Sequence, residues 1–128
     1  MSVRQIYLVG HCGSDAFALK LAIEKATEGR PPIDVRTAVD TDDDVLNAAG
    51  DVLLLINRQL GNVLRRTTGV ELIRQLAQRD DPPRMMLITN FEDAQQEAIN
   101  AGAFPGFGKT DIHKPETKAK LQAALGGE

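Results

Sequence analysis

The sequence predicts one α/β domain, a doubly wound five-stranded parallel sheet with helices on both faces. The chain has 128 residues, which is the size of a single domain spanning residues 1–128. Hydrophobic residues make up 42% of it and charged residues 26%, as in ordinary globular proteins. Strand-like apolar segments alternate with helix-like segments five times. Such regular alternation is typical of a parallel sheet that helices cover on both faces.

The first half of the chain contains two of these strand–helix pairs. Residues 6–9 form a continuous apolar run, as in a strand that is buried on both faces. Ser14 can accept hydrogen bonds from the first-turn amides of a helix that is predicted to stop near Gly29. Residues 33–39 are predicted as the second strand. Residues 41–50 are predicted as a short helix, because a threonine and an acid open it at capping-box spacing.

The second half contains three more pairs. Residues 51–57 hold five consecutive apolar residues between two polar ones, which predicts a central parallel strand. Thr68 is predicted to cap the helix that follows. The remaining strands and helices are predicted over residues 85–88, 90–100, 104–107 and 115–125. Asn90 and Asp93 form the start signal of the helix over 90–100. The last helix starts with a proline, which suits a first turn because that position needs no amide donor.

The composition argues against several classes of function. Fifteen Lys and Arg stand against eighteen Asp and Glu, for a net charge of -3, so nucleic-acid binding is not expected. Cys12 is the single cysteine, which excludes an intramolecular disulfide framework and a multi-cysteine zinc site. The apolar run near the N-terminus is too short for a signal peptide or a membrane span. We therefore expect a cytoplasmic protein without a membrane partner.

Four segments and two single residues follow the pattern of a known family. The segments are DVLLLIN at 51–57, GVELIR at 69–74, MLIT at 86–89 and EAINAGA at 97–103, and the single residues are Phe107 and Lys109. Over nearly the whole chain this pattern resembles the response-regulator receiver domains, the CheY-like phosphoacceptor family. The resemblance implies strand order 2-1-3-4-5. It also implies a signalling role in a two-component system or phosphorelay rather than an enzymatic one.

Receivers carry their chemistry in loops at the carboxyl ends of the strands, where ligands of such sheets bind. An aspartate after the third strand is phosphorylated, two acids after the first strand hold Mg²⁺, and a hydroxyl and a lysine contact the phosphoryl group. The resemblance places Thr89 and Lys109 at the two contact positions. It places Phe107 at the aromatic position that reports the switch.

The other receiver positions have lost their acids. Asn57 stands at the phosphoacceptor position, and an amide cannot form an acyl phosphate. His11 and Cys12 stand at the metal-binding positions. The resemblance therefore implies a pseudo-receiver that is not phosphorylated on aspartate and holds neither Mg²⁺ nor another cofactor.

Phosphorylation of an aspartate at another position is an alternative. Asp15, Asp40 or Asp42 could lie near the pocket, and Asp15 or Asp51 could serve as an unconventional acceptor. Asp51 is the poorer candidate, because it lies at the amino end of its strand. We favour a simpler interpretation for Asp15 and the acids at 42–44, as helix N-terminal acids stabilised by the macrodipole.

Cys12 has two interpretations. A cysteine that follows a first parallel strand resembles the phosphocysteine site of phosphotransferase IIB proteins, so a phosphocysteine carrier is the alternative function. The favoured interpretation is a buried, hydrophobic Cys12 in a loop at residues 10–13 that fills the emptied cation pocket.

Two further candidate sites are a basic loop after the third strand and a surface for a protein partner. Arg58, Arg65 and Arg66 could hold an anion near Lys109, or they could be solvated loop residues. In the receiver family the fourth helix, fifth strand and fifth helix bind partners, which corresponds here to about residues 90–125 with Phe107 central. We expect a protein partner at this surface, and a second copy of the chain is one candidate.

Overall fold

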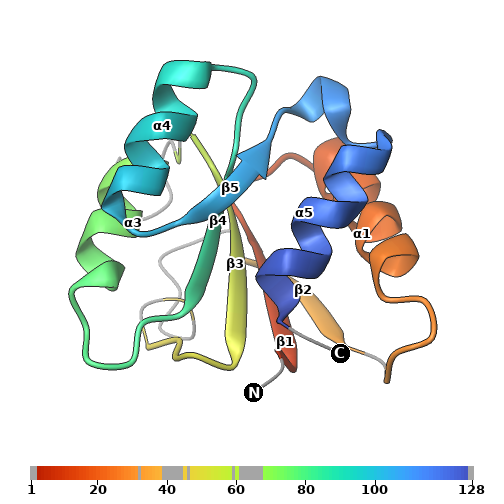
Figure 1. Cartoon of the computed structure of the whole chain (residues 1–128), viewed down its shortest axis with the longest axis horizontal. Helices are drawn as coiled ribbons and strands as arrows, with labels where there is room; N and C mark the ends of the chain where they lie inside the picture. Colours follow the sequence, from red (N-terminus) through yellow and green to blue (C-terminus); the bar gives the residue numbers. More distant parts are fainter. Residues whose placement is uncertain are drawn as a thin grey trace.

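The computed structural model describes residues 3–31, 33–38, 45, 47–58, 60 and 68–126. Five parallel strands form one sheet in the order β2-β1-β3-β4-β5, which confirms the predicted fold class (Figure 1). The strands are β1 (Gln5–Val9), β2 (Asp34–Ala38), β3 (Val52–Asn57), β4 (Arg84–Ile88) and β5 (Phe104–Phe107). The helices are α1 (Gly13–Ala26), α3 (Gly69–Ala77), α4 (Glu92–Ala101) and α5 (Pro115–Leu125), with a short 3₁₀ helix η2 (Lys109–Asp111). Most of the helix predicted over 41–50 lies outside the described residues.

The sheet is buried on both faces. Helices α1 and α5 lie together on one face, and α3 and α4 lie together on the other (Figure 1). The side chains of β3 alternate between the two cores. Leu53 and Leu55 pack on the side of α1 and α5, whereas Leu54 and Ile56 pack on the side of α3 and α4. All four are fully buried, which explains why this strand is an unbroken apolar run.

The predicted start of α3 is confirmed. Thr68 accepts a hydrogen bond from the Glu71 amide at 3.1 Å through its hydroxyl, and the Glu71 carboxylate accepts one from the Thr68 amide at 3.1 Å. This reciprocal capping box satisfies two amides that the helix itself leaves without partners.

The other two helix starts near the pocket differ from the prediction. The N-cap of α1 is Cys12 rather than Ser14, and the N-cap of α4 is Phe91 rather than Asn90. Neither N-cap side chain makes a capping hydrogen bond. Asn90 instead accepts hydrogen bonds from the amide and hydroxyl of Thr110, at 3.3 and 3.2 Å. Tertiary bonding to the loop after β5 has thus replaced local capping.

The junction of β4 and β5 is irregular. The register shifts between Met86 and Ile88, and Gln95 of α4 reaches into the junction. Its amide donates to the Leu87 carbonyl at 2.7 Å and accepts from the Gly106 amide at 3.1 Å. A Cβ at Gly106 would lie 2.1 Å from the Leu87 oxygen, so only glycine fits there. Gln95 therefore braces β5 against β4 where a regular ladder is interrupted.

Among the helices of the described part of the chain, none is long and apolar enough to cross a membrane.

Candidate functional site

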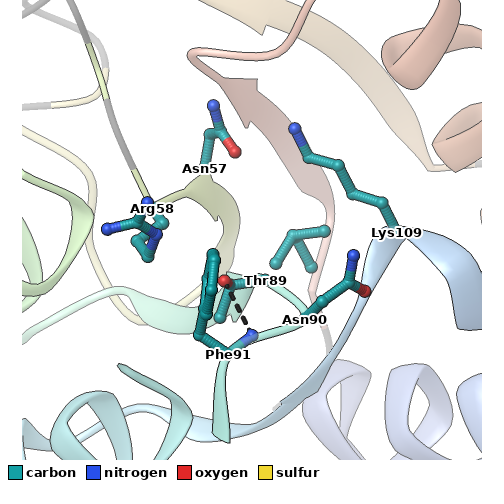
Figure 2. Close-up of a pocket in the computed structure, with 7 residues that line it drawn as sticks. Asn57, Arg58, Thr89, Asn90, Phe91 and Lys109 are labelled. Atoms are coloured by element: carbon teal, nitrogen blue, oxygen red, sulfur yellow. Dashed lines mark hydrogen bonds between the residues drawn. The ribbon is translucent and has the colours of Figure 1, made fainter. Parts of the chain in front are cut away.

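A pocket of about 300 Å³ opens at the carboxyl ends of β3 and β4. Seven described residues line it: Asn57, Arg58, Ile88, Thr89, Asn90, Phe91 and Lys109. Figure 2 shows that they come from the ends of β3 and β4 and from the turn after β5. The fold therefore brings together four of the predicted site residues, Asn57, Arg58, Thr89 and Lys109, from three separate loops.

Thr89 is held at the floor of the pocket. Only 6% of it is exposed, and its hydroxyl oxygen accepts a hydrogen bond from the Phe91 amide at 3.2 Å (Figure 2). The bonds of Asn90 to Thr110 tie the loop after β4 to the turn after β5. Both loops are consequently fixed relative to each other around the pocket.

Lys109 contacts an acid from a distant part of the chain. Its ammonium lies 2.9 Å from the carboxylate of Asp15, which belongs to the first turn of α1. The hydrogen bond from Lys109 is the main reason that the pKa of Asp15 lies below its ordinary value. Asp15 is thus a pocket-edge acid as well as a helix N-terminal one. Asp40 and Asp42 lie outside the described residues.

The side chain at the phosphoacceptor position, Asn57, and one of the two at the metal-binding positions, His11, are bonded to backbone carbonyls. Asn57 donates its amide hydrogen to the Gly10 carbonyl at 3.1 Å. The Nε2 of His11 lies 2.9 Å from the Leu55 carbonyl, so this nitrogen is the donor of the neutral ring. Burial lowers the pKa of His11, and its Nδ1 is buried without a hydrogen-bond partner. These side chains close the ends of β1 and β3.

The expected burial of Cys12 is wrong. Cys12 is exposed at the N-cap of α1, with its sulfur 3.4 Å from the Ser14 hydroxyl. The physical reason is that the neighbouring His11 occupies the inward position beneath the strand ends, so Cys12 faces solvent.

A central role of Phe107 at a partner surface stays a prediction, although this side chain is buried. Phe107 is only 3% exposed and packs in the core on the side of α1 and α5. The aromatic side chain that reaches solvent is Phe91, which is 60% exposed. The Arg58 guanidinium carbon lies 4.7 Å from the centre of the Phe91 ring. Arg65 and Arg66 lie outside the described residues.

Sequence reasoning missed Asn90 and Phe91 as pocket residues. Both directly follow Thr89 at the end of a predicted buried strand, and that position was the available signal. The pattern instead suggested helix capping for Asn90, because a local hydrogen bond is what sequence spacing can predict.

The residues present fit Mg²⁺ poorly. Within the described ranges, no three His, Cys, Asp or Glu side chains gather to hold a metal ion. None of the described lining residues is an acid, and the nearby carboxylate of Asp15 is engaged by Lys109. Mg²⁺ is normally held by carboxylates and other hard oxygen ligands. The donor set of this edge therefore lacks the pair of acids with which receivers hold Mg²⁺.

Structural comparison identifies the fold class. The signal receiver domain of a DNA-binding response regulator from Colwellia psychrerythraea matches with a TM-score of 0.67 and 15% identity, over 93% of this chain and 95% of that chain. A response-regulator receiver domain from Rhodospirillum rubrum matches with a TM-score of 0.59 and 17% identity, over 94% and 91%. FixJ-N matches with a TM-score of 0.61 and 16% identity, over 100% of both chains. The chain therefore has the fold of response-regulator receiver domains.

Sequence comparison adds no closer relationship. No family model matches the chain, and no curated protein matches it at a significant level.

Proposed function

We propose that this protein is a receiver-type signalling module of the two-component or phosphorelay class that is not phosphorylated on aspartate and acts by binding another protein. The observation that carries the proposal is Asn57 at the end of β3, whose amide is bonded to the Gly10 carbonyl. An amide offers no carboxylate oxygen to attack a phosphoryl donor. The receiver fold of the chain supports the signalling class.

The decisive experiment measures intact mass after incubation with acetyl phosphate and Mg²⁺. A phosphorylatable receiver treated in parallel is the positive control. We expect the control to gain a phosphoryl group and this protein to gain none. A group that is added to a carboxylate such as Asp15 would overturn the proposal.

The same experiment tests Cys12 as a phosphocysteine. An exposed thiol at the start of a 14-residue helix is accessible to a phosphoryl donor, which is the observation that favours this second candidate. A group present in the wild type and absent from Cys12→Ser would make the protein a phosphocarrier. An unmodified wild type excludes acetyl phosphate as a donor to Cys12.

The partner surface that we propose remains α4, β5 and α5, with exposed side chains of α4 in place of Phe107. Phe91 and Ile99 are large apolar residues that reach solvent there. Exposed aromatic side chains are typical anchors of protein interfaces. A second copy of the chain is the first partner to test, by sedimentation of wild type and Phe91→Ser over a range of concentrations. Phe17→Ser, at an equally exposed phenylalanine on α1, is the matched control.

We expect Phe91→Ser to weaken a dimer and Phe17→Ser to leave it unchanged. The reverse result would place the contact on α1. A wild type that stays monomeric at all concentrations would exclude the second copy as the partner.

A further inference from the structure

The charge of the pocket lining favours a negatively charged ligand. Two lining residues, Arg58 and Lys109, are cations, and none of the described lining residues is an acid. Figure 2 shows the two cations on opposite sides of the pocket. Its volume of about 300 Å³ is at the lower end of the range for small-molecule sites. The pocket is therefore suited to a small anion rather than to a cation.

The polar side chains between the two cations are placed to donate. The Thr89 oxygen accepts from the Phe91 amide, and the Asn90 side-chain oxygen accepts from Thr110. A hydroxyl whose oxygen accepts a bond still has a proton to donate, and an amide whose oxygen is engaged presents its NH₂ group. The acceptor oxygens of Thr89 and Asn90 are thus already engaged.

Arg58 is held by stacking. Its guanidinium lies over the Phe91 ring, with 4.7 Å between Cζ and the ring centre. A stacked guanidinium keeps its planar fork of donors, which matches the two oxygens of a carboxylate or phosphate group. The stack places Arg58 beside Phe91, on the opposite side of the pocket from Lys109 (Figure 2).

The bond between Lys109 and Asp15 is weak enough to exchange. The two atoms are 2.9 Å apart, but both side chains are partly exposed, at 36% and 28%. Partly exposed ion pairs contribute little because water screens them. A ligand with two negative charges can therefore replace Asp15 as the partner of Lys109.

We propose that this pocket binds a small dianion noncovalently, either a phosphate monoester or a dicarboxylate. Arg58 and Lys109 hold its charges, and Thr89 and Asn90 donate hydrogen bonds to its oxygens. Binding releases Asp15, which lies in the first turn of α1, so occupancy of the pocket is transmitted to that helix. The inference rests on the proposed absence of aspartate phosphorylation, since a covalent phosphoryl group would fill the same space.

The test is an NMR titration of the labelled protein with inorganic phosphate and, separately, with succinate, at constant pH and ionic strength. We expect saturable shifts at the amides of Thr89 and Asn90 with at least one of the two probes. Saturation with phosphate alone identifies a phosphate-bearing ligand, and saturation with succinate alone identifies a dicarboxylate. Linear, unsaturated shifts with both probes would overturn the inference.

Variants assign the binding to the pocket. Arg58→Met and Lys109→Met should each weaken binding by about tenfold or more, because each removes a charge-assisted hydrogen bond. Lys114→Met is the matched control, since Lys114 is exposed and pairs with Asp111 outside the pocket. Equal weakening by the control would show that net charge alone attracts the anion, and the inference would fail.

Asp15→Asn gives a result of opposite sign. Removing the competing carboxylate should tighten anion binding by up to about fivefold. Weaker anion binding in Asp15→Asn, together with Mg²⁺ binding that depends on Asp15, would overturn the inference in favour of a cation site. The mass experiment remains independent, because a covalently attached phosphoryl group would contradict the proposed function, whereas a failed titration contradicts this inference alone.

Discussion

The carboxyl edge of the sheet has two halves that use similar polar side chains differently. The closed half consists of Gly10, His11 and Asn57, at the ends of β1 and β3. Its side chains are bonded to the carbonyls of Leu55 and Gly10. The open half consists of Thr89, Asn90 and Lys109, at the ends of β4 and β5. These residues line the pocket, which Asn57 borders from the closed half.

The difference shows how polar side chains at one edge of a sheet can be satisfied in two ways. Acids in the closed half would need a cation to offset their repulsion from the nearby carbonyls. Neutral donors at the same positions stabilise those carbonyls directly, so this half needs no ligand. The open half keeps the cation Lys109, which pairs with Asp15, and two side chains with protons to donate. We therefore expect no metal-dependent chemistry at the closed half and recognition of an anion at the open half.

The largest expected effect on stability comes from removing the hydrogen bonds of Gln95, which connect β4 and β5 beneath the open half. Gln95→Leu leaves the Leu87 carbonyl and the Gly106 amide without their side-chain partner. We expect a loss of about 2–4 kcal/mol in the free energy of unfolding, because partly buried polar groups lose their hydrogen bonds. Urea unfolding measures it.

Gln96→Leu is the matched control for this change. Gln96 is exposed and donates to the Asn100 side chain at 3.1 Å, so its replacement should change stability by no more than about 0.5 kcal/mol. Equal losses of stability in both variants would show that replacing any glutamine of α4 has this effect. The hydrogen bonds of Gln95 would then not be the cause.

A smaller effect is expected when an acid is restored to the closed half. Asn57→Asp replaces the donor to Gly10 by a carboxylate oxygen that faces the same carbonyl. We expect a loss of about 1–3 kcal/mol at neutral pH. The carbonyl favours the protonated acid and raises the pKa of the new carboxyl, so the loss should shrink as the pH falls.

Urea unfolding at neutral and mildly acidic pH checks this prediction. Asn47→Asp, at an exposed position, is the control and should show a small change that does not shrink in acid. A neutral or stabilising Asn57→Asp would mean that the closed half tolerates a carboxylate, and the comparison of the two halves would fail.

The smallest effect is a pH dependence from His11. Burial lowers its pKa, so the unfolded chain binds a proton more readily than the folded one. The stabilisation that neutral His11 contributes is complete above its pKa in the unfolded chain, about 6.5. It is lost as the pH falls toward the lower pKa of His11 in the folded protein, at up to about 1.4 kcal/mol per pH unit.

Replacing each histidine in turn isolates this contribution. His11→Gln should flatten the stability profile below about pH 6.5, whereas His113→Gln, at an exposed position, should leave it unchanged. A profile that His113→Gln flattens instead would contradict the role assigned to the closed half.

The strands and one helix start could be predicted from the sequence for local reasons. The unbroken apolar run at β3 indicates burial on both faces, and Thr68 and Glu71 form a cap within one helical turn. Asn90 shows the limit of such reasoning. It too has a helix-start pattern, with Asp93 three residues later, but its oxygen bonds to Thr110, twenty residues away.

The fold class, the strand order that the resemblance implies and the set of loops in which the site lies all follow from the sequence alone. Periodicity and helix signals are short-range properties of the chain, so they survive without knowledge of its packing. The tertiary structure decided that Phe107 is buried, that Cys12 is exposed and that Asp15 meets Lys109. The reason is that the burial or pairing of each residue depends on the side chains packed beside it, and those side chains come from distant parts of the chain.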